Sequence, residues 1–190
     1  MRGAGVAATA ALLLVGCAPR PVPSEPADAF LARLQSLCGK AYPGRVVTDD
    51  PADAAFAGKP LVMHVRTCGP GEVRIPFHVG DDRSRTWIVA RTAGGLRLKH
   101  DHRHADGSPD AMTMYGGDSI APGSATAQAF PADAESIALF RREKREVSVS
   151  NVWEIEATPT VFVYALRRAD RHFRVAFDLT TPVAPPPPPW

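Results

Sequence analysis

The stretch that decides the fold is residues 72–98, EVRIPFHVGDDRSRTWIVARTAGGLRL. Apolar and polar residues alternate in it with a period of two, which is typical of half-buried β-strands. Gly80-Asp81-Asp82 and Ala93-Gly94-Gly95 interrupt the alternation, and connections this short favour antiparallel neighbours. The stretch therefore predicts consecutive antiparallel strands.

The same alternation recurs in other parts of the chain, in the sets Leu61/Met63/Val65, Val161/Val163 and Phe173/Val175/Phe177. One amphipathic helix is expected first, with Phe30, Leu34, Leu37 and Cys38 on one face and Gly39 as its stop. One or two helical turns are expected within residues 131–140. We therefore predict a mainly β fold, an antiparallel barrel or barrel-like sandwich of roughly eight to ten strands with one N-terminal helix.

The N-terminus carries Arg2, an apolar run over residues 4–15, and the tetrapeptide LVGC at 14–17. The run is shorter than the roughly 20 residues that cross a bilayer, so it predicts a secretory signal peptide. The tetrapeptide resembles the lipobox of bacterial lipoproteins, which implies cleavage before Cys17 and acylation of that residue. The resulting organisation is a signal peptide (1–16), a lipidated Cys and tether (17–26), one β-rich domain (27–181) and a Pro-rich tail (182–190).

The lipoprotein resemblance also implies a place in the cell and a membrane partner. Ala18 follows the lipidated Cys, and the lack of Asp there resembles outer-membrane sorting in enterobacterial lipoproteins. We therefore expect a lipid-anchored protein of the bacterial cell envelope that faces the periplasm. The 22 Lys and Arg nearly balance the 20 Asp and Glu, which argues against nucleic-acid binding. The Pro-rich tail predicts an extended spacer or a ligand for a partner.

The cysteines point to a disulfide. Lipidation of Cys17 would leave Cys38 and Cys68 in an oxidising compartment, where we expect them to bond to each other. A catalytic thiol or a metal pair is the alternative, although neither cysteine belongs to a CxxC motif.

Residues 34–44, LQSLCGKAYPG, resemble the start of calycin β-barrels, in which a helical turn and a Gly-aromatic-Gly stretch precede the first strand. The aromatic residue here is Tyr42, where lipocalins usually have Trp. The chain as a whole resembles uncharacterised secreted bacterial proteins, a likeness that implies no activity.

Residues 96–106, LRLKHDHRHAD, contain the most unusual pattern. Strand alternation predicts that His100, His102 and His104 continue the apolar face begun by Leu96 and Leu98. If that face is the interior of a barrel, the three imidazoles line the lumen or its mouth.

The preceding strand adds a second polar candidate, Arg85, on the same face as Trp87. Arg85 could hold an anionic group of a ligand, or pair with a carboxylate at a strand end. Arg85, Trp87, His100 and His102 are therefore the candidate residues for binding a small ligand.

A metal site is the alternative hypothesis. A turn at residues 106–109 would bring Met112 and Met114 back beside His102 and His100, and imidazole with thioether suits Cu(I). A slip of one residue would turn both methionines to the other face. The candidate ligands of Cu or Zn are His100, His102, His104, Asp106, Met112 and Met114; the competing interpretation is hydrogen-bonded histidines near a rim.

Known catalytic motifs are missing from the sequence. Residues 100–105, HDHRHA, depart from the HxHxDH pattern of metallo-β-lactamases, and neither HExxH nor GxSxG occurs. We therefore assign no catalytic residues and expect a non-enzymatic module that binds a small ligand or an envelope partner. The alternative is a metal-binding protein or metalloenzyme that uses the histidine strand.

Overall fold

The structure is a computed structural model that describes Met1 and residues 25–190. The expected signal peptide, Cys17 and almost all of the tether lie outside the described residues. In the part of the chain that is described, no helix is long and apolar enough to cross a membrane.

The predicted mainly β fold is confirmed. The strands are β1 (Ala41–Val46), β2 (Leu61–His64), β3 (Thr67–Cys68), β4 (Glu72–Val79), β5 (Asp82–Thr92), β6 (Gly95–His102), β7 (Tyr115–Asp118), β8 (Ala127–Pro131), β9 (Val152–Ala157), β10 (Val161–Arg168) and β11 (Arg171–Asp178). The helical segments are α1 (Pro26–Gln35), η1 (Pro51–Phe56), α2 (Ala134–Arg142) and η2 (Glu146–Ser148).

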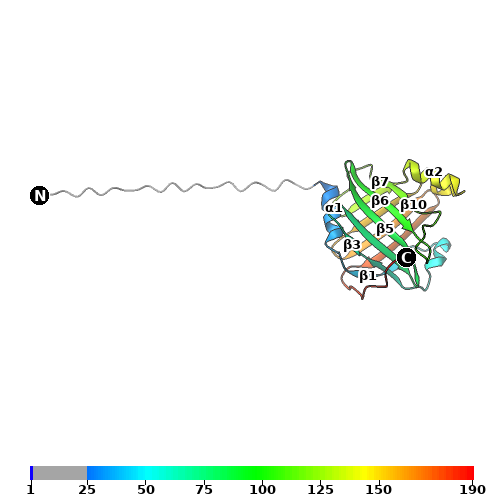
Figure 1. Ribbon diagram of the computed structural model, residues 1–190, viewed down its shortest axis with the longest axis horizontal. Helices are drawn as coiled ribbons and strands as arrows, with labels where there is room; N and C mark the ends of the chain where they lie inside the picture. The colour runs from blue at the N-terminus through cyan, green and yellow to red at the C-terminus, as the bar shows by residue number, and fades with distance from the viewer. Residues whose placement is uncertain (2–24) are drawn as a thin grey trace.

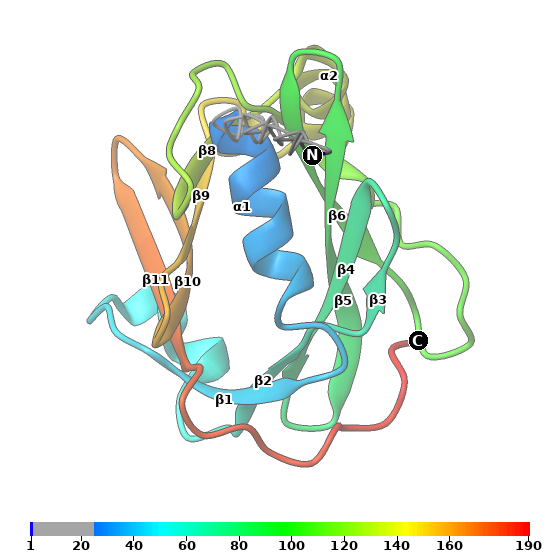
Figure 2. The same ribbon diagram turned by 90° about the vertical axis from the view of Figure 1, so that its left-hand side faces the viewer.

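The strands form one antiparallel sheet that curls into a nearly closed barrel (Figures 1 and 2). Their order around the barrel is β7-β6-β5-β4-β2-β1-β11-β10-β9-β8, and β3 pairs with β4 beside this path. Strands β4, β5 and β6 follow one another as antiparallel neighbours, as the alternating stretch predicts.

The two edges of the sheet come together where β7 meets β8, and Gly117 allows their close approach. The backbone N–H of Asp133, just after β8, donates to the carbonyl of Gly116 at 2.9 Å. A Cβ on Gly116 would lie 1.9 Å from the carbonyl oxygen of Leu98, and one on Gly117 would lie 1.8 Å from that of Pro131. A larger residue at position 117 would therefore push the two edges apart, and one at position 116 would push β7 away from β6.

Helix α1 lies across one end of the barrel (Figure 2). Phe30 and Leu34 on its inner face are fully buried in the core, and the helix leads into Gly39, which has a φ of +80°. Phe30, Leu34 and Leu37 are buried as predicted. The helix ends earlier than expected, at Gln35 rather than at Gly39, and Cys38 is exposed. The second expected helical segment is α2, which begins after Asp133, whose carboxylate accepts from the N–H of Ser136 at 2.8 Å.

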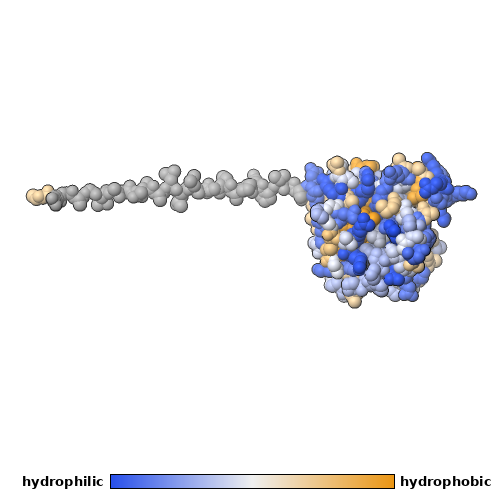
Figure 3. All heavy atoms as spheres, viewed as in Figure 1, coloured by the Kyte–Doolittle hydropathy of each residue, from blue (hydrophilic) through white to orange (hydrophobic). Residues whose placement is uncertain are grey.

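The expected disulfide is present. Cys38 follows α1, and its sulfur is bonded to that of Cys68 in β3, with 6.3 Å between the Cα atoms. The bond therefore ties the helical end of the barrel to its wall. On the face of the barrel seen in Figure 3, hydrophilic residues predominate and apolar ones are scattered.

The residues of strand β10 that face the barrel interior differ from those predicted from the sequence. Val161 and Val163 were expected as the buried alternating set, whereas Phe162 and Tyr164 belong to the core cluster. The strand carries apolar residues on both faces, so a period of two has two possible phases there. The larger aromatic side chains fill the barrel interior.

Candidate functional site

Four residues that the sequence singles out for ligand binding meet on the inner face of β5 and β6. In the register of these strands, Arg85 lies opposite His102 and Trp87 lies opposite His100. All four line one cavity of about 160 Å³, which we call the mouth pocket. Phe56, at the end of η1, also lines it, and η1, cyan in Figure 1, lies at the end of the barrel away from α1. Binding by these residues stays a prediction.

A stack of aromatic rings forms one wall of the mouth pocket. Trp87 lies between Phe77 and Tyr164, at centroid distances of 4.9 and 4.3 Å and with nearly parallel rings. Phe56 continues the stack from Phe77 to Phe173, at 6.2 and 4.9 Å. Four strands and η1 supply these rings. A flat ligand can pack against such a wall, since aromatic stacking adds about 0.5–1.5 kcal/mol to burial.

His100 is buried, and both of its ring nitrogens have partners. Nδ1 lies 3.1 Å from the carbonyl oxygen of Tyr115, and Nε2 lies 2.7 Å from the hydroxyl of Tyr164. Because a carbonyl oxygen only accepts, Nδ1 carries the proton and Nε2 accepts the hydrogen of the Tyr164 hydroxyl. Burial lowers the pKa of His100 to about 3, so its ring is neutral at neutral pH.

His102 and Tyr115 continue this network. The hydroxyl of Tyr115 lies 3.1 Å from Nε2 of His102, and its ring stacks on His100 at 4.6 Å. Burial, and then the charge of Arg85, lower the pKa of His102 to about 4. Burial raises the pKa of Tyr115 to about 12 and that of Tyr164 well above its usual value. The two histidines and two tyrosines are therefore uncharged at neutral pH.

Both arginines of the mouth pocket are paired with carboxylates. Arg85 donates to Asp82 at 2.5 Å, which is the strand-end pairing that the sequence offered as one alternative. Arg171 donates to Asp50 at 2.8 Å and also contacts the buried Asp53. The positive charge around the pocket is thus balanced by the protein itself.

Sequence reasoning assigned seven residues of this pocket to no site: Phe56, Phe77, Tyr115, Tyr164, Leu166, Arg171 and Phe173. Phe173 was assigned to the buried face of its strand but not to a site. The spacing of Phe162, Tyr164 and Leu166 was the available signal for β10. Nothing in the local sequence marks Phe56 or Arg171, since their positions depend on how η1 folds over the end of the barrel.

The other predicted metal ligands are less well gathered. The expected turn forms, with the N–H of His104 donating to Ser108 at 2.9 Å. It starts earlier than expected, however, so His104 lies beyond the end of β6 and its side chain is 57% exposed. His104 therefore does not continue the inner face. Asp106 lies in the turn and accepts from the N–H and hydroxyl of Ser108.

The two methionines return beside the histidine strand only in part. The N–H of Met114 donates to the carbonyl of His100 at 2.6 Å, but Met114 has a φ of +57° and is 47% exposed. Tyr115, not Met114, packs on the His100 ring, while Met112 packs at the edge of the core. Among the described residues, no three His, Cys, Asp or Glu side chains form a metal-ligand group. Cu or Zn binding here stays a prediction.

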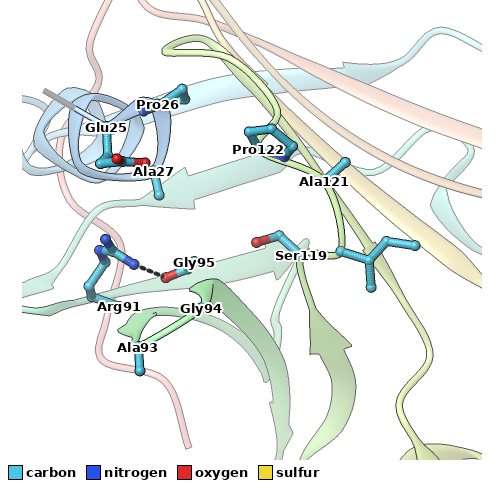
Figure 4. Close-up of a pocket in the computed structure, with 11 residues that line it drawn as sticks. Glu25, Pro26, Ala27, Arg91, Ala93, Gly94, Gly95, Ser119, Ala121 and Pro122 are labelled. Carbon is cyan, nitrogen blue, oxygen red and sulfur yellow. Dashed lines mark hydrogen bonds between the residues drawn. The ribbon is translucent and has the colours of Figure 1, made fainter. Parts of the chain in front are cut away.

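A larger hollow of about 490 Å³ lies at the start of α1 (Figure 4). Its one arginine, Arg91, donates to Asp28 at 2.6 Å and to the carbonyls of Thr92 and Gly95. Most of the other residues that line the hollow have small side chains or contribute backbone atoms. The hollow lies next to the residues where the tether joins the domain. It therefore offers less binding chemistry than the mouth pocket.

The Pro-rich tail packs against its own barrel, and we call residues 182–190 the C-terminal strap (Figure 2). The N–H of Val183 donates to the carbonyl of Ala41 at 2.9 Å. Arg83 donates to the carbonyl of Pro188 at 3.0 Å, and its guanidinium lies 5.7 Å from the ring centroid of Trp190. The segment therefore contacts its own barrel at several points, while its roles as a spacer or as a ligand for a partner stay predictions.

Comparison with known proteins gives no further guide to this site. No protein family, curated protein or solved structure matches the chain.

Proposed function

We propose that this chain is a non-enzymatic binding module that holds a small molecule in the mouth pocket. The observation that carries the proposal is that Arg85, Trp87, His100 and His102 line one cavity with an aromatic wall. Pockets that combine apolar walls with a few oriented polar groups are typical of small-molecule sites. The nearly closed barrel with its leading helix is compatible with the calycin resemblance, although fold alone does not determine function.

The charges around the pocket are paired within the protein, which favours an uncharged ligand. Arg85 and Arg171 are paired with carboxylates, and an ionic ligand would have to break such a pair. His102 and Tyr115 offer neutral hydrogen-bonding groups beside the aromatic wall. A cavity of about 160 Å³ suits one flat ring. We therefore propose a single-ring, uncharged molecule with a hydroxyl or amide group.

Titration with single-ring probes tests this proposal. Phenol and benzamide represent the uncharged class, benzoate the anions and benzylammonium the cations. In spectra of the ¹⁵N-labelled full chain, an uncharged probe should shift the indole N–H of Trp87, while that of Trp190 on the outer surface should stay fixed. Binding of the ionic probes alone would contradict the ligand class, and no binding by any probe would contradict the proposed function.

A blocking substitution sharpens the test. Leu166 lines the mouth pocket, so Leu166→Trp should fill it and abolish probe binding. Ile120 is 84% exposed and lies outside the mouth pocket, so Ile120→Trp is the matched control and should bind as the unaltered chain does. Equal binding by both variants would place the probe outside the pocket.

We further propose that Cys17 anchors the module in the bacterial envelope, facing the periplasm from the outer membrane, where an envelope protein is a second possible partner. The lipobox resemblance supports this, because the acyl chains on a lipobox cysteine hold a protein stably. Incorporation of a labelled fatty acid into the full chain, and its loss in Cys17→Ser, is the expected result. Labelling that persists in the variant would contradict it, and membrane fractionation tests the outer-membrane assignment.

A further inference from the structure

A second pair of histidines lies on the outer face of the barrel. His64 in β2 and His78 in β4 belong to neighbouring strands, in which Val62 is opposite His78. His64, two residues along the same face, is therefore a diagonal neighbour of His78, at a backbone separation of roughly 7–8 Å. Imidazoles at such positions can reach one shared atom.

These two rings differ from the inner pair in their hydrogen bonding. His64 is 5% and His78 is 4% exposed, although both face away from the barrel interior. Nδ1 of His64 and Nε2 of His78 are buried without a hydrogen-bond partner. A buried polar atom without a partner costs about 1–3 kcal/mol, and an ion or water commonly accounts for one.

The C-terminal strap lies over part of this face. It runs beside Ala41, the β1 residue opposite His64, and its Pro186 and Pro187 line a hollow of about 280 Å³ with His78. The hollow gives His78 a route to solvent beside the strap.

The surrounding charge limits what the pair can bind. Arg66 and Arg83 act on His78, and only Asp82 opposes them. A divalent cation would meet this positive field without a carboxylate ligand. Two neutral imidazoles suit a monovalent soft cation, because a filled d shell allows Cu(I) and Ag(I) to be held by two nitrogen donors in line.

We propose that His64 and His78 form a two-coordinate site for Cu(I) beneath the C-terminal strap. The two unpartnered nitrogens bind the metal ion, and no other group of the described chain has to coordinate it. The site is separate from the mouth pocket, whose His100 uses both ring nitrogens in hydrogen bonds to tyrosines.

The test uses the full chain with Cys17→Ser, so that no free thiol remains beside the Cys38–Cys68 disulfide. Ag(I), which is not redox-active here, is added while the imidazole ¹⁵N resonances are recorded. One equivalent should shift the rings of His64 and His78 and leave the other four histidines unchanged. Shifts at His100 or His102 instead, or at no histidine, would overturn the proposal.

Variants then measure the contribution of each ring. Cu(I) affinity is obtained by competition with a Cu(I) chelator under ascorbate. His64→Asn and His78→Asn should each weaken binding about 100-fold or more, and His172→Asn, at an exposed position of β11, should change it less than twofold. Near-UV circular dichroism checks that each variant is folded. Unchanged affinity in folded His64→Asn and His78→Asn, or Zn(II) bound as tightly as Cu(I), would contradict the two-coordinate site.

Discussion

The two buried histidine pairs of this barrel occupy similar strands but opposite environments. The inner pair, His100 and His102, is hydrogen-bonded to Tyr164 and Tyr115. The outer pair, His64 and His78, is buried, yet each ring has a nitrogen without a partner. Burial alone therefore does not define a histidine's role: completed hydrogen bonds hold a ring in the structure, whereas an unpartnered nitrogen is free to bind.

The largest expected effect is that of pH on stability. His100 has a pKa of about 3, and His102 and His78 of about 4, against 6.5 in an unfolded chain. Below pH 6.5 the unfolded chain therefore binds more protons, and the free energy of unfolding falls as the pH falls. Each such histidine lowers the free energy of unfolding by about 1.4 kcal/mol per pH unit. The three together lower it by about 4 kcal/mol per pH unit.

Urea unfolding between pH 7 and pH 4 measures this slope. His78→Leu should make the slope smaller, because the ring at position 78 no longer titrates while the inner pair is intact. A free energy of unfolding that does not change over this range would show that the three histidines are not held neutral.

The next effect is a difference in stability between variants of the inner and the outer histidine pair. His100→Leu leaves the Tyr164 hydroxyl and the Tyr115 carbonyl without partners, so we expect a loss of about 3 kcal/mol. His78→Leu removes a polar atom that has no partner, so in metal-free protein its stability should equal or slightly exceed that of the unaltered chain. Equal losses in the two variants, measured by urea unfolding at pH 7, would erase the distinction between the pairs.

Removal of the C-terminal strap should affect the outer pair alone. Deletion of residues 182–190 exposes His78 to water, so its pKa should rise from about 4 towards 6.5 while that of His100 stays near 3. The stability should fall by about 1–2 kcal/mol through the lost contacts at Ala41 and Arg83. Imidazole resonances followed through a pH titration measure both values, and an unchanged His78 pKa would mean that the strap does not cause its burial.

The smallest effect concerns the end of the strap. Trp190→Ala removes the contact with the Arg83 guanidinium, worth about 0.5–1 kcal/mol at an exposed site. Thermal unfolding should show a correspondingly small loss, with the inner pair unaffected. A loss above about 2 kcal/mol would indicate that Trp190 anchors more than the strap.

The sequence was sufficient for one side of the mouth pocket. Alternation along β5 and β6 placed Arg85, Trp87, His100 and His102 on one face, because a strand has a fixed period and these two strands are joined by a short turn. The chain after β6 was less predictable, since the positive φ of Met114 changes which side chain faces the barrel and brings Tyr115 against His100.

The partners of these residues could not be predicted, because closure of the barrel brings them from distant strands. Tyr164 reaches His100 across 64 positions of the chain, and the apolar run of β10 allowed two phases. Strand β9 was not among the predicted strands, although Trp153, Ile155 and Ala157 alternate with polar residues. The strap contacts the barrel through backbone carbonyls and through the terminal Trp, and its Pro-rich composition gives no sign of these contacts.

The most direct test of the account follows the imidazole resonances of the full chain while phenol is added. The account predicts shifts at His102, which lines the mouth pocket beside the Tyr115 hydroxyl, and at its neighbour His100, with no change at His64 and His78. Shifts confined to the outer pair, or the absence of any shift at the inner pair up to saturating phenol, would contradict the assignment of the mouth pocket as the binding site.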